Sequence, residues 1–298
     1  MKNIITYIKY PIRIALSYIA PQKLAGIYYK NACHKELNWN NPQDLNEVIN
    51  WEKFNGDTTL WPLLADKYKV REYIKAKGLE HILIKQYGVW ENAKDIDFDK
   101  LPDSYVLKTN HGSGTNIIIK NTSPYVPKMR KQLNEWLKLR FGQETVEFHY
   151  LKIKPVIIAE ELLVDEDNSF SSSIVDYKVW CFNGKAFCIC VYFNRTSDSV
   201  CFKVFDREWN LIEDAPNYTT SFQSGTVNIS KPEKLDTLIK YAEILSAGYP
   251  QMRVDFYIIK NKIYFGEITM TSNGGYMRYF TPSFLFKMGQ EARKGFNL

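Results

Sequence analysis

Polar and apolar positions recur with helical spacing in three stretches of the chain. Residues 43–78 show this spacing, and Asp44 or Asn46 can cap a helix start there. Residues 128–140 place apolar side chains on one face and basic side chains on the other. Residues 231–246 form the third predicted helix, with a proline near its start. Helices are therefore expected both early and late in the chain.

Runs of β-branched and aromatic residues predict strands in the remaining segments. Residues 82–90 and 105–120 contain such runs before the middle of the chain, whereas after Pro155 the runs follow one another closely. Asn183-Gly184 separates two of them and predicts a hairpin turn. The predicted strands lie within residues 82–90, 105–120, 156–163, 176–193, 200–205 and 253–269. The expected fold class is α+β with much antiparallel sheet.

The composition is typical of a soluble globular protein. The 298 residues (34.9 kDa) are 45% hydrophobic and 24% charged, enough to bury a substantial core in more than one lobe. The formal net charge of +6 suits an anionic ligand. The basic residues are spread along the chain and form no block like a nucleic-acid-binding arm, so nucleic acid is not an expected partner.

The cysteines argue against a disulfide framework and against a zinc site. Their number is odd and no two of them form a CxxC pair. Reduced thiols in the cytosol are the simplest interpretation. The five residues are Cys33, Cys181, Cys188, Cys190 and Cys201.

The first twenty residues are rich in apolar side chains, but Lys9, Pro11 and Arg13 interrupt them. The uninterrupted apolar runs are too short for a membrane span or a signal peptide. The pattern favours an ordinary helix packed on the domain. A basic amphipathic helix at a membrane surface is the alternative interpretation.

The segment YVLKTNHGSGTNIIIK, residues 105–120, places a lysine on a strand before a glycine-bearing loop. A Walker loop or a dinucleotide fingerprint would need a helix after the glycines, and a kinase would need HRD and DFG tripeptides that the chain lacks. The pattern indicates a strand–loop–strand flap. Gly112 and Gly114 would let its backbone N–H groups approach phosphate oxygens, with Lys108 as the positive charge.

A hairpin centred on Asn261 would pair Asp255 directly with Glu267. On this register the remaining residues of the same sheet face are apolar or aromatic, and two carboxylates so placed repel unless something compensates them. Mg²⁺ is one compensation, because it binds carboxylates together with substrate phosphates. Arg253, which projects to the same face, is another, and a solvated pair at a sheet end is a third. The apolar or aromatic residues expected on this face are Tyr257, Ile259, Ile263 and Phe265.

Taken together and in this order, these features resemble ATP-grasp enzymes, specifically the TupA-like branch of bacterial surface-polysaccharide proteins. The resemblance rests on LNEVINWEKF, ADKYKVREYIKAKG, LPDSYVLKTNHGSG and FGEITMTSNGG, and covers roughly residues 40–280. It implies an ATP-grasp fold of two α+β lobes gripping ATP. The implied domains are an N-terminal, partly helical region of residues 1–104, a nucleotide-binding lobe of residues 105–163 and a C-terminal lobe with the metal site of residues 164–298.

The resemblance implies a set of nucleotide-binding residues. Lys108 and Lys178 would contact phosphates, and the loop from His111 to Thr115 would close over them, although His111 itself is expected to be a bystander. Glu160 would bind the adenine amino group, and the backbone from Glu161 to Leu163 would contact the edge of the base. Asp167 would bind the ribose, with Asp165 and Glu166 as competitors. The implied residues of the flap are Gly112, Ser113 and Gly114.

For the metal, the resemblance implies Asp255 and Glu267 as ligands of Mg²⁺. Most ATP-grasp ligases carry Asn two residues after the metal-binding Glu, whereas this chain has Thr269; Thr269 or Asn273 would supply the third ligand. Arg253 and Lys178 are the implied catalytic residues, with Arg253 stabilising the reacting phosphoryl and tetrahedral oxygens.

The activity implied is ATP-dependent ligation of a carboxylate to an amine through an acyl phosphate. The substrates implied are a sugar acid of a capsular or cell-wall polymer, as a small molecule or lipid-linked, and an amino acid or amine. The reaction is expected in the cytoplasm, with peripheral membrane contact through the N-terminus as an option. A sugar phosphotransferase with the same ATP site, and a glycosyltransferase or scaffold of polysaccharide assembly, are the alternatives.

Overall fold

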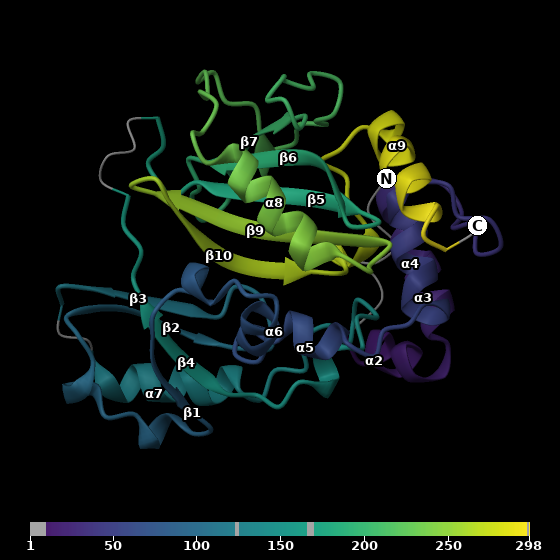
Figure 1. Ribbon diagram of the computed structural model, residues 1–298. Coiled ribbons are helices and arrows are strands. Elements are labelled where there is room, and N and C mark those ends of the chain that lie inside the picture. Colours follow the sequence, from purple (N-terminus) through teal and green to yellow (C-terminus); the bar gives the residue numbers. More distant parts are fainter. Residues whose placement is uncertain (1–9, 123–124, 166–169, 297) are drawn as a thin grey trace. The chain divides into compact units, whose positions relative to one another are not determined.

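The computed structural model describes residues 10–122, 125–165, 170–296 and 298 (Figure 1). The chain divides into two compact units. The six-stranded unit contains the described residues up to Thr58, Glu144–Val146 and Asp165–Leu298, and the four-stranded unit contains Thr59–Gln143 and Glu147–Val164. This division differs from three domains in chain order, because the early helical region is shared between the two units.

The four-stranded unit is built on an antiparallel sheet with the strand order β1-β4-β2-β3. Side chains of β2 alternate between buried and half-buried, and Tyr105 and Leu107 point into the core. Helix α7 covers this core with Met129 and Leu133, as the helical spacing predicts. The strands are β1 (Gln86–Trp90), β2 (Ser104–Thr109), β3 (Asn116–Lys120) and β4 (Ile157–Glu161); the helices are α5 (Trp61–Ala65), α6 (Val70–Ala76) and α7 (Val126–Trp136).

The six-stranded unit has the strand order β10-β9-β5-β6-β7-β8, antiparallel except for the parallel pair β7 and β8. Two tight hairpins organise it. Asn183 and Gly184 join β5 to β6, Lys260 and Asn261 join β9 to β10, and all four have positive φ, the conformation that matches strand twist. The strands are β5 (Asp176–Phe182), β6 (Lys185–Phe193), β7 (Val200–Phe205), β8 (Phe222–Gln223), β9 (Gln251–Ile259) and β10 (Lys262–Thr269).

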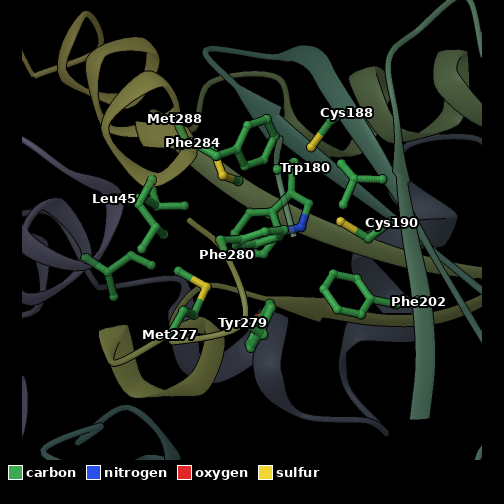
Figure 2. Packing of buried hydrophobic residues seen from close by; sticks show 14 of the residues in the cluster. Leu45, Trp180, Cys188, Cys190, Phe202, Met277, Tyr279, Phe280, Phe284 and Met288 are labelled. Carbon is green, nitrogen blue, oxygen red and sulfur yellow. The ribbon is translucent and has the colours of Figure 1, made fainter. Parts of the chain in front are cut away.

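Helices cover both faces of this six-stranded sheet. Helix α8 (Leu235–Ser246) packs on β5, β6 and β9, and helices α4 (Leu45–Asn55) and α9 (Pro282–Arg293) contribute to the core on the other face. Figure 2 shows Trp180 in this core together with Phe280 and Phe284. The Trp180 and Phe280 ring centroids are 5.8 Å apart, edge to face. This apolar cluster supports the strands that carry the charged residues described below.

Helix α4 is tied to the turn that follows β10, the η5 turn (Ser272–Gly275). Asp44 caps the helix with a reciprocal Glu47 contact, as its sequence position suggests. Buried Asn46 exchanges hydrogen bonds of 2.9 Å with the backbone N–H and carbonyl of Met277. Asn50 donates to the Gly275 carbonyl at 2.8 Å. Two segments that carry the family resemblance, LNEVINWEKF and FGEITMTSNGG, are therefore in contact through the side-chain amide of Asn50 and the carbonyl of Gly275.

The chain also contains helices that the sequence analysis did not identify. They are α3 (Pro21–Cys33) and α9, whose N-terminus is capped by the Thr281 hydroxyl. Helix α2 (Tyr10–Ile19) precedes α3, and the first nine residues lie outside the described part of the chain. None of the helices in the described residues is both long and apolar enough to cross a membrane.

The Asn50 contact predicts a specific loss of stability. Asn50→Ala removes hydrogen bonds to the Asn46 and Gly275 carbonyls and should lower the free energy of unfolding by about 1–3 kcal/mol. Asn55→Ala is the matched control, because exposed Asn55 makes the same within-helix bond to Trp51 but no contact with the turn. Urea unfolding measures both. Equal effects of the two substitutions would contradict a role for Asn50 in fixing the turn.

Buried Glu52 predicts a pH dependence of stability. Burial raises the pKa of its carboxyl from 4.5 to about 8, although Gln251 donates a hydrogen bond to it at 2.9 Å. The folded protein therefore holds a proton that the unfolded chain releases, so stability should fall by about 4 kcal/mol as pH rises from 4.5 to 8. In Glu52→Gln this component should vanish. Melting curves across that pH range test it, and parallel curves for the two proteins would contradict the assignment.

Candidate functional site

Three adjacent strands of the six-stranded sheet bring predicted site residues to one face. Lys178 on β5 lies opposite Asp255 on β9, and Asp255 lies opposite Glu267 on β10. Directly opposed residues of antiparallel strands project to the same side. The predicted pairing of Asp255 with Glu267 is confirmed, and Lys178 joins them.

The predicted surroundings of the acid pair are wrong in part. The register shifts by one residue between Phe265 and Glu267, where Gly266 forms a bulge. Before the bulge, Ile263 and Phe265 pair with Ile258 and Phe256, so they project to the opposite face. The acids' own face carries Tyr257 and Ile259 as expected, with Tyr264 and Lys262 opposite them.

Six charged side chains on this face form a chain of alternating sign. Arg195 contacts Asp176 at 2.8 Å, and Lys178 lies 3.8 Å from Asp176 and also bonds Asp255. Arg253 donates two hydrogen bonds to Asp255, at 2.7 and 2.8 Å, and one to Glu267 at 3.2 Å. The terminal side chains, Arg195 and Glu267, are 48% and 40% exposed, whereas Asp255 is 2% exposed. The centre of the chain is therefore desolvated and its ends reach solvent.

The charges at the centre hold one another ionised. Burial alone would raise the pKa of Asp255, but the positive charges of Arg253 and Lys178 and their hydrogen bonds outweigh it and hold that pKa below its ordinary value of 3.8. Burial opposes the charge of Arg253 as well, and Asp255 keeps its pKa well above the ordinary range. Arg253 thus stays charged in a buried setting, and Lys178 bonds the same carboxylate. Such cations are suited to bind the oxygens of an anionic reactant.

Aromatic rings and hydroxyls position the two cations. Arg253 lies over the Trp180 ring at 5.8 Å and Lys178 over the Tyr192 ring at 5.2 Å. The Arg253 guanidinium also donates to the hydroxyls of Thr269, at 3.0 Å, and Ser272, at 3.1 Å. The sheet and the η5 turn therefore fix the guanidinium together.

The oxygens beside Arg253 match the preferences of Mg²⁺. Within the described residues, no group of three or more Asp, Glu, His or Cys side chains is arranged to hold a metal ion. Asp255, Glu267 and Thr269 nevertheless form an oxygen donor set of the kind that Mg²⁺ takes together with phosphates. Asp255 already accepts three bonds, of about four that a carboxylate can accept. Glu267 is thus the more accessible carboxylate. Exposed Asn273 donates its amide to the Tyr276 carbonyl of its own turn.

In the four-stranded unit, Lys108 forms an ion pair with Glu160 at 2.5 Å. The two side chains are diagonal neighbours on adjacent strands β2 and β4. Arg71 of α6 lies 4.0 Å from the other Glu160 oxygen, and Gln86 of β1 is opposite Glu160. Glu160 is 5% exposed. Two predicted nucleotide-binding residues thus lie together on one sheet face, with Arg71 as a neighbour that the sequence analysis did not name.

The predicted flap is the β2–β3 hairpin, and most of its loop is anchored. His111 is buried and its Nε2 contacts the Leu139 carbonyl at 3.1 Å, while burial lowers its pKa. Lys67 donates to the Gly112 carbonyl at 2.6 Å. Ser113 and Gly114 at the tip are exposed, and Gly114 has a φ of +75° that suits glycine. Only the tip, Ser113 and Gly114, would thus be free to move. The sequence analysis expected the whole loop from His111 to Thr115 to close over the phosphates.

The predicted base and ribose residues follow β4. Glu161 ends that strand and its N–H donates to the Lys85 carbonyl at 2.9 Å, and Leu163 is half-buried two residues later. Asp165 is described and half-buried. Asp167 and its competitor Glu166 lie outside the described residues.

Asp176, Arg195 and Ser272 were missed by the sequence analysis. A signal existed for Asp176, because it precedes Lys178 by two residues on a strand and so shares its face. Arg195 and Ser272 lie in connections after β6 and β10, where spacing along a strand gives no information.

The order of these features along the chain is that of ATP-grasp enzymes. A family model described as TupA-like ATPgrasp matches residues 47–291. The chain therefore belongs to the TupA-like ATP-grasp family. This membership confirms the resemblance seen in the sequence, the ATP-grasp fold and the predicted class of enzyme, an ATP-dependent ligase.

Solved structures with a similar fold are distant in sequence. D-alanine–D-alanine ligase from Bacillus anthracis is 15% identical over 78% of this chain and 68% of its own, with a TM-score of 0.43. L-amino acid ligase from Bacillus licheniformis is 11% identical over 88% of this chain and 57% of its own, with a TM-score of 0.49. A comparison with curated proteins finds no match.

The charge chain predicts a large stability effect at its centre. Arg253→Met leaves the Asp255 carboxylate buried with fewer partners and should cost about 3–5 kcal/mol of unfolding free energy. In the double variant Arg253→Met/Asp255→Asn, part of that loss should return, because the uncompensated charge is gone. Exposed Arg278→Met is the control. Urea unfolding at neutral pH measures all three, and equal losses in the single and double variants would contradict the coupling.

Proposed function

We propose that this protein is an ATP-dependent carboxylate–amine ligase. The observation that carries the proposal is the buried, alternating charge chain around Asp255 in a member of an ATP-grasp family. It holds two basic side chains, Lys178 and Arg253, partly desolvated on one sheet face. Cations held in this way stabilise the phosphoryl and tetrahedral oxygens that such a ligation generates.

The four-stranded unit is proposed to serve the nucleotide. Lys108 would bind phosphate oxygens, exchanging its ion pair with Glu160 for the more highly charged ligand. The exposed tip at Ser113 and Gly114 offers backbone N–H groups to the same phosphates. Glu160, the backbone from Glu161 to Leu163, and Asp167 or its neighbours are the proposed contacts of the base and ribose.

The six-stranded unit is proposed to serve the chemistry. A substrate carboxylate oxygen forms a bond to the γ-phosphorus while the bond to the bridging oxygen breaks and ADP leaves. An amine then adds to the carbonyl carbon of the acyl phosphate. The tetrahedral species expels phosphate and loses the amine proton, which leaves an amide. Lys178 and Arg253 neutralise the oxygens that gain negative charge in both steps.

Mg²⁺ is the proposed metal. Asp255, Glu267 and Thr269 would hold it, with Glu267 as the accessible carboxylate. When bound, the ion supplies positive charge to the phosphates of ATP. Arg253 contacts all three of these residues, so it would orient the oxygens that the ion uses.

The proposed carboxylate substrate is a sugar acid of a bacterial surface polysaccharide, small or lipid-linked, and the proposed acceptor is an amino acid or another amine. The resemblance to surface-polysaccharide proteins of the TupA-like branch supports this choice. We propose the cytoplasm as the location, because ATP is available there. Membrane contact is considered separately below.

The proposal predicts separate effects on binding and turnover. Lys108→Met and Lys178→Met should each weaken ATP binding about tenfold to a hundredfold, because each removes a charged phosphate contact. Glu267→Gln should lower the rate of phosphate release at least about a hundredfold. Lys185→Met is the control, since this lysine is 74% exposed on the neighbouring strand β6. Calorimetry and a phosphate-release assay with candidate sugar acids and amines measure these effects.

Product analysis distinguishes this activity from the alternatives. An amide with one phosphate released per turnover supports the ligase. A phosphorylated sugar without an amide would assign a phosphotransferase. Unchanged ATP affinity in folded Lys108→Met and Lys178→Met would overturn the nucleotide-binding assignment.

A further inference from the structure

Helix α2 presents an apolar stripe to solvent and turns Arg13 and Ser17, with half-buried Ile14 and Leu16, toward the protein. Arg13 forms an ion pair with Glu144 at 3.2 Å, and Ser17 is 2% exposed. Three large apolar side chains point the other way: Ile12, Tyr18 and Ile19 are 52%, 65% and 82% exposed. A helix packed only to complete a domain would have the reverse orientation.

The exposed residues of α2 form one stripe. Ile12, Ala15 and Ile19 are separated by three and four positions and are all exposed, and Pro11 and Tyr18 flank them. Residues with this spacing lie on one face of a helix. The stripe ends where α3 begins, beside exposed Lys23. A continuous apolar face is thus bordered by positive charge.

The formal excess of basic over acidic residues lies in the first 35 residues of the sequence. Residues 1–35 contain six basic and no acidic residues, whereas from Glu36 onward 33 basic and 33 acidic residues balance. Basic residues occur throughout the chain, but of these two parts only residues 1–35 contain more basic than acidic residues. The six are Lys2, Lys9, Arg13, Lys23, Lys30 and Lys35, of which the first two lie outside the described residues.

We propose that α2 docks on the surface of an anionic lipid bilayer. Its apolar face would enter the boundary between headgroups and acyl chains, and exposed Lys23 would contact anionic headgroups. The other described basic residues of this segment, Arg13, Lys30 and Lys35, already pair with acids of the protein. At 10 residues, or about 15 Å, the helix lies on the bilayer and does not span it. Tyr18 suits this depth, since its ring is apolar and its hydroxyl polar.

The charge distribution favours a bilayer over a second copy of the chain. In a twofold dimer through α2 the exposed Lys23 of both copies would lie at the same interface, where Glu144, the acid paired with α2, already bonds Arg13. An anionic bilayer supplies apolar depth and negative charge at once. This inference does not depend on the proposed ligase activity.

Sedimentation with lipid vesicles tests the proposal. The full chain should bind vesicles of phosphatidylglycerol and phosphatidylcholine in equal parts, and should bind pure phosphatidylcholine vesicles much more weakly. The variant Ile12→Gln/Tyr18→Gln/Ile19→Gln should lose at least about tenfold in affinity. Phe286→Gln is the matched control, since Phe286 is 48% exposed on helix α9. Lys23→Gln should weaken binding, and salt should weaken it further.

The same samples contain the outcomes that would overturn the proposal. Equal vesicle affinity of the triple variant and the parent would exclude the α2 face. Equal binding to both vesicle types would exclude the anionic surface. If the parent does not bind vesicles but forms a concentration-dependent dimer, and the triple variant does not dimerise, then the α2 face binds a second copy of the chain. Unchanged melting temperature and ATP affinity in the triple variant would show that lost binding reflects the surface and not the fold.

Discussion

The buried carboxylate of Asp255 constrains the whole six-stranded sheet. It can remain ionised in that position only because Arg253 and Lys178 bond it directly, and both depend on strand register. A slip of one residue in β5 or β9 would move one member of the pair to the opposite face and leave a buried charge without its partner. The ion pair thus helps to select the register, and the register places Glu267 and Thr269 beside the same guanidinium.

Apolar packing and amide hydrogen bonds support this electrostatic centre from both ends. Trp180 packs against Phe280 and also lies beneath Arg253, so the hydrophobic core fixes a cation as well as the sheet. At the other end, α4 holds the η5 turn that carries Ser272, another partner of Arg253. The side chains proposed for chemistry are therefore held by interactions that have no chemical role themselves.

The sequence predicted local structure and pairing well where the signals were local. The hairpin at Asn183-Gly184 and the helix over Met129 and Leu133 follow from turn chemistry and periodicity, and both are present. The pairing of Asp255 with Glu267 is also present, for a reason that the prediction did not include. The turn contains two residues, Lys260 and Asn261, and not three centred on Asn261, so the register near it is shifted by one residue, and the bulge at Gly266 restores the pairing. A lone glycine within a strand pattern is a bulge signal, so this information was available. The contacts of Asn46, by contrast, join residues 231 positions apart and have no local signature.

The division of the chain also has a consequence for the order in which it folds during synthesis. The four-stranded unit is an insertion: the chain leaves the six-stranded unit at Thr58 and returns to it, apart from Glu144–Val146, only at Asp165. Its strands and α7 lie within about a hundred residues, so the insertion can collapse while the ribosome is still adding the later strands. Helix α4 emerges far earlier than the η5 turn and α9 that cover its apolar residues. A ribosome-bound chain therefore exposes Leu45, Val48 and Ile49 for most of its synthesis, and this segment is where we expect a chaperone to bind the nascent protein.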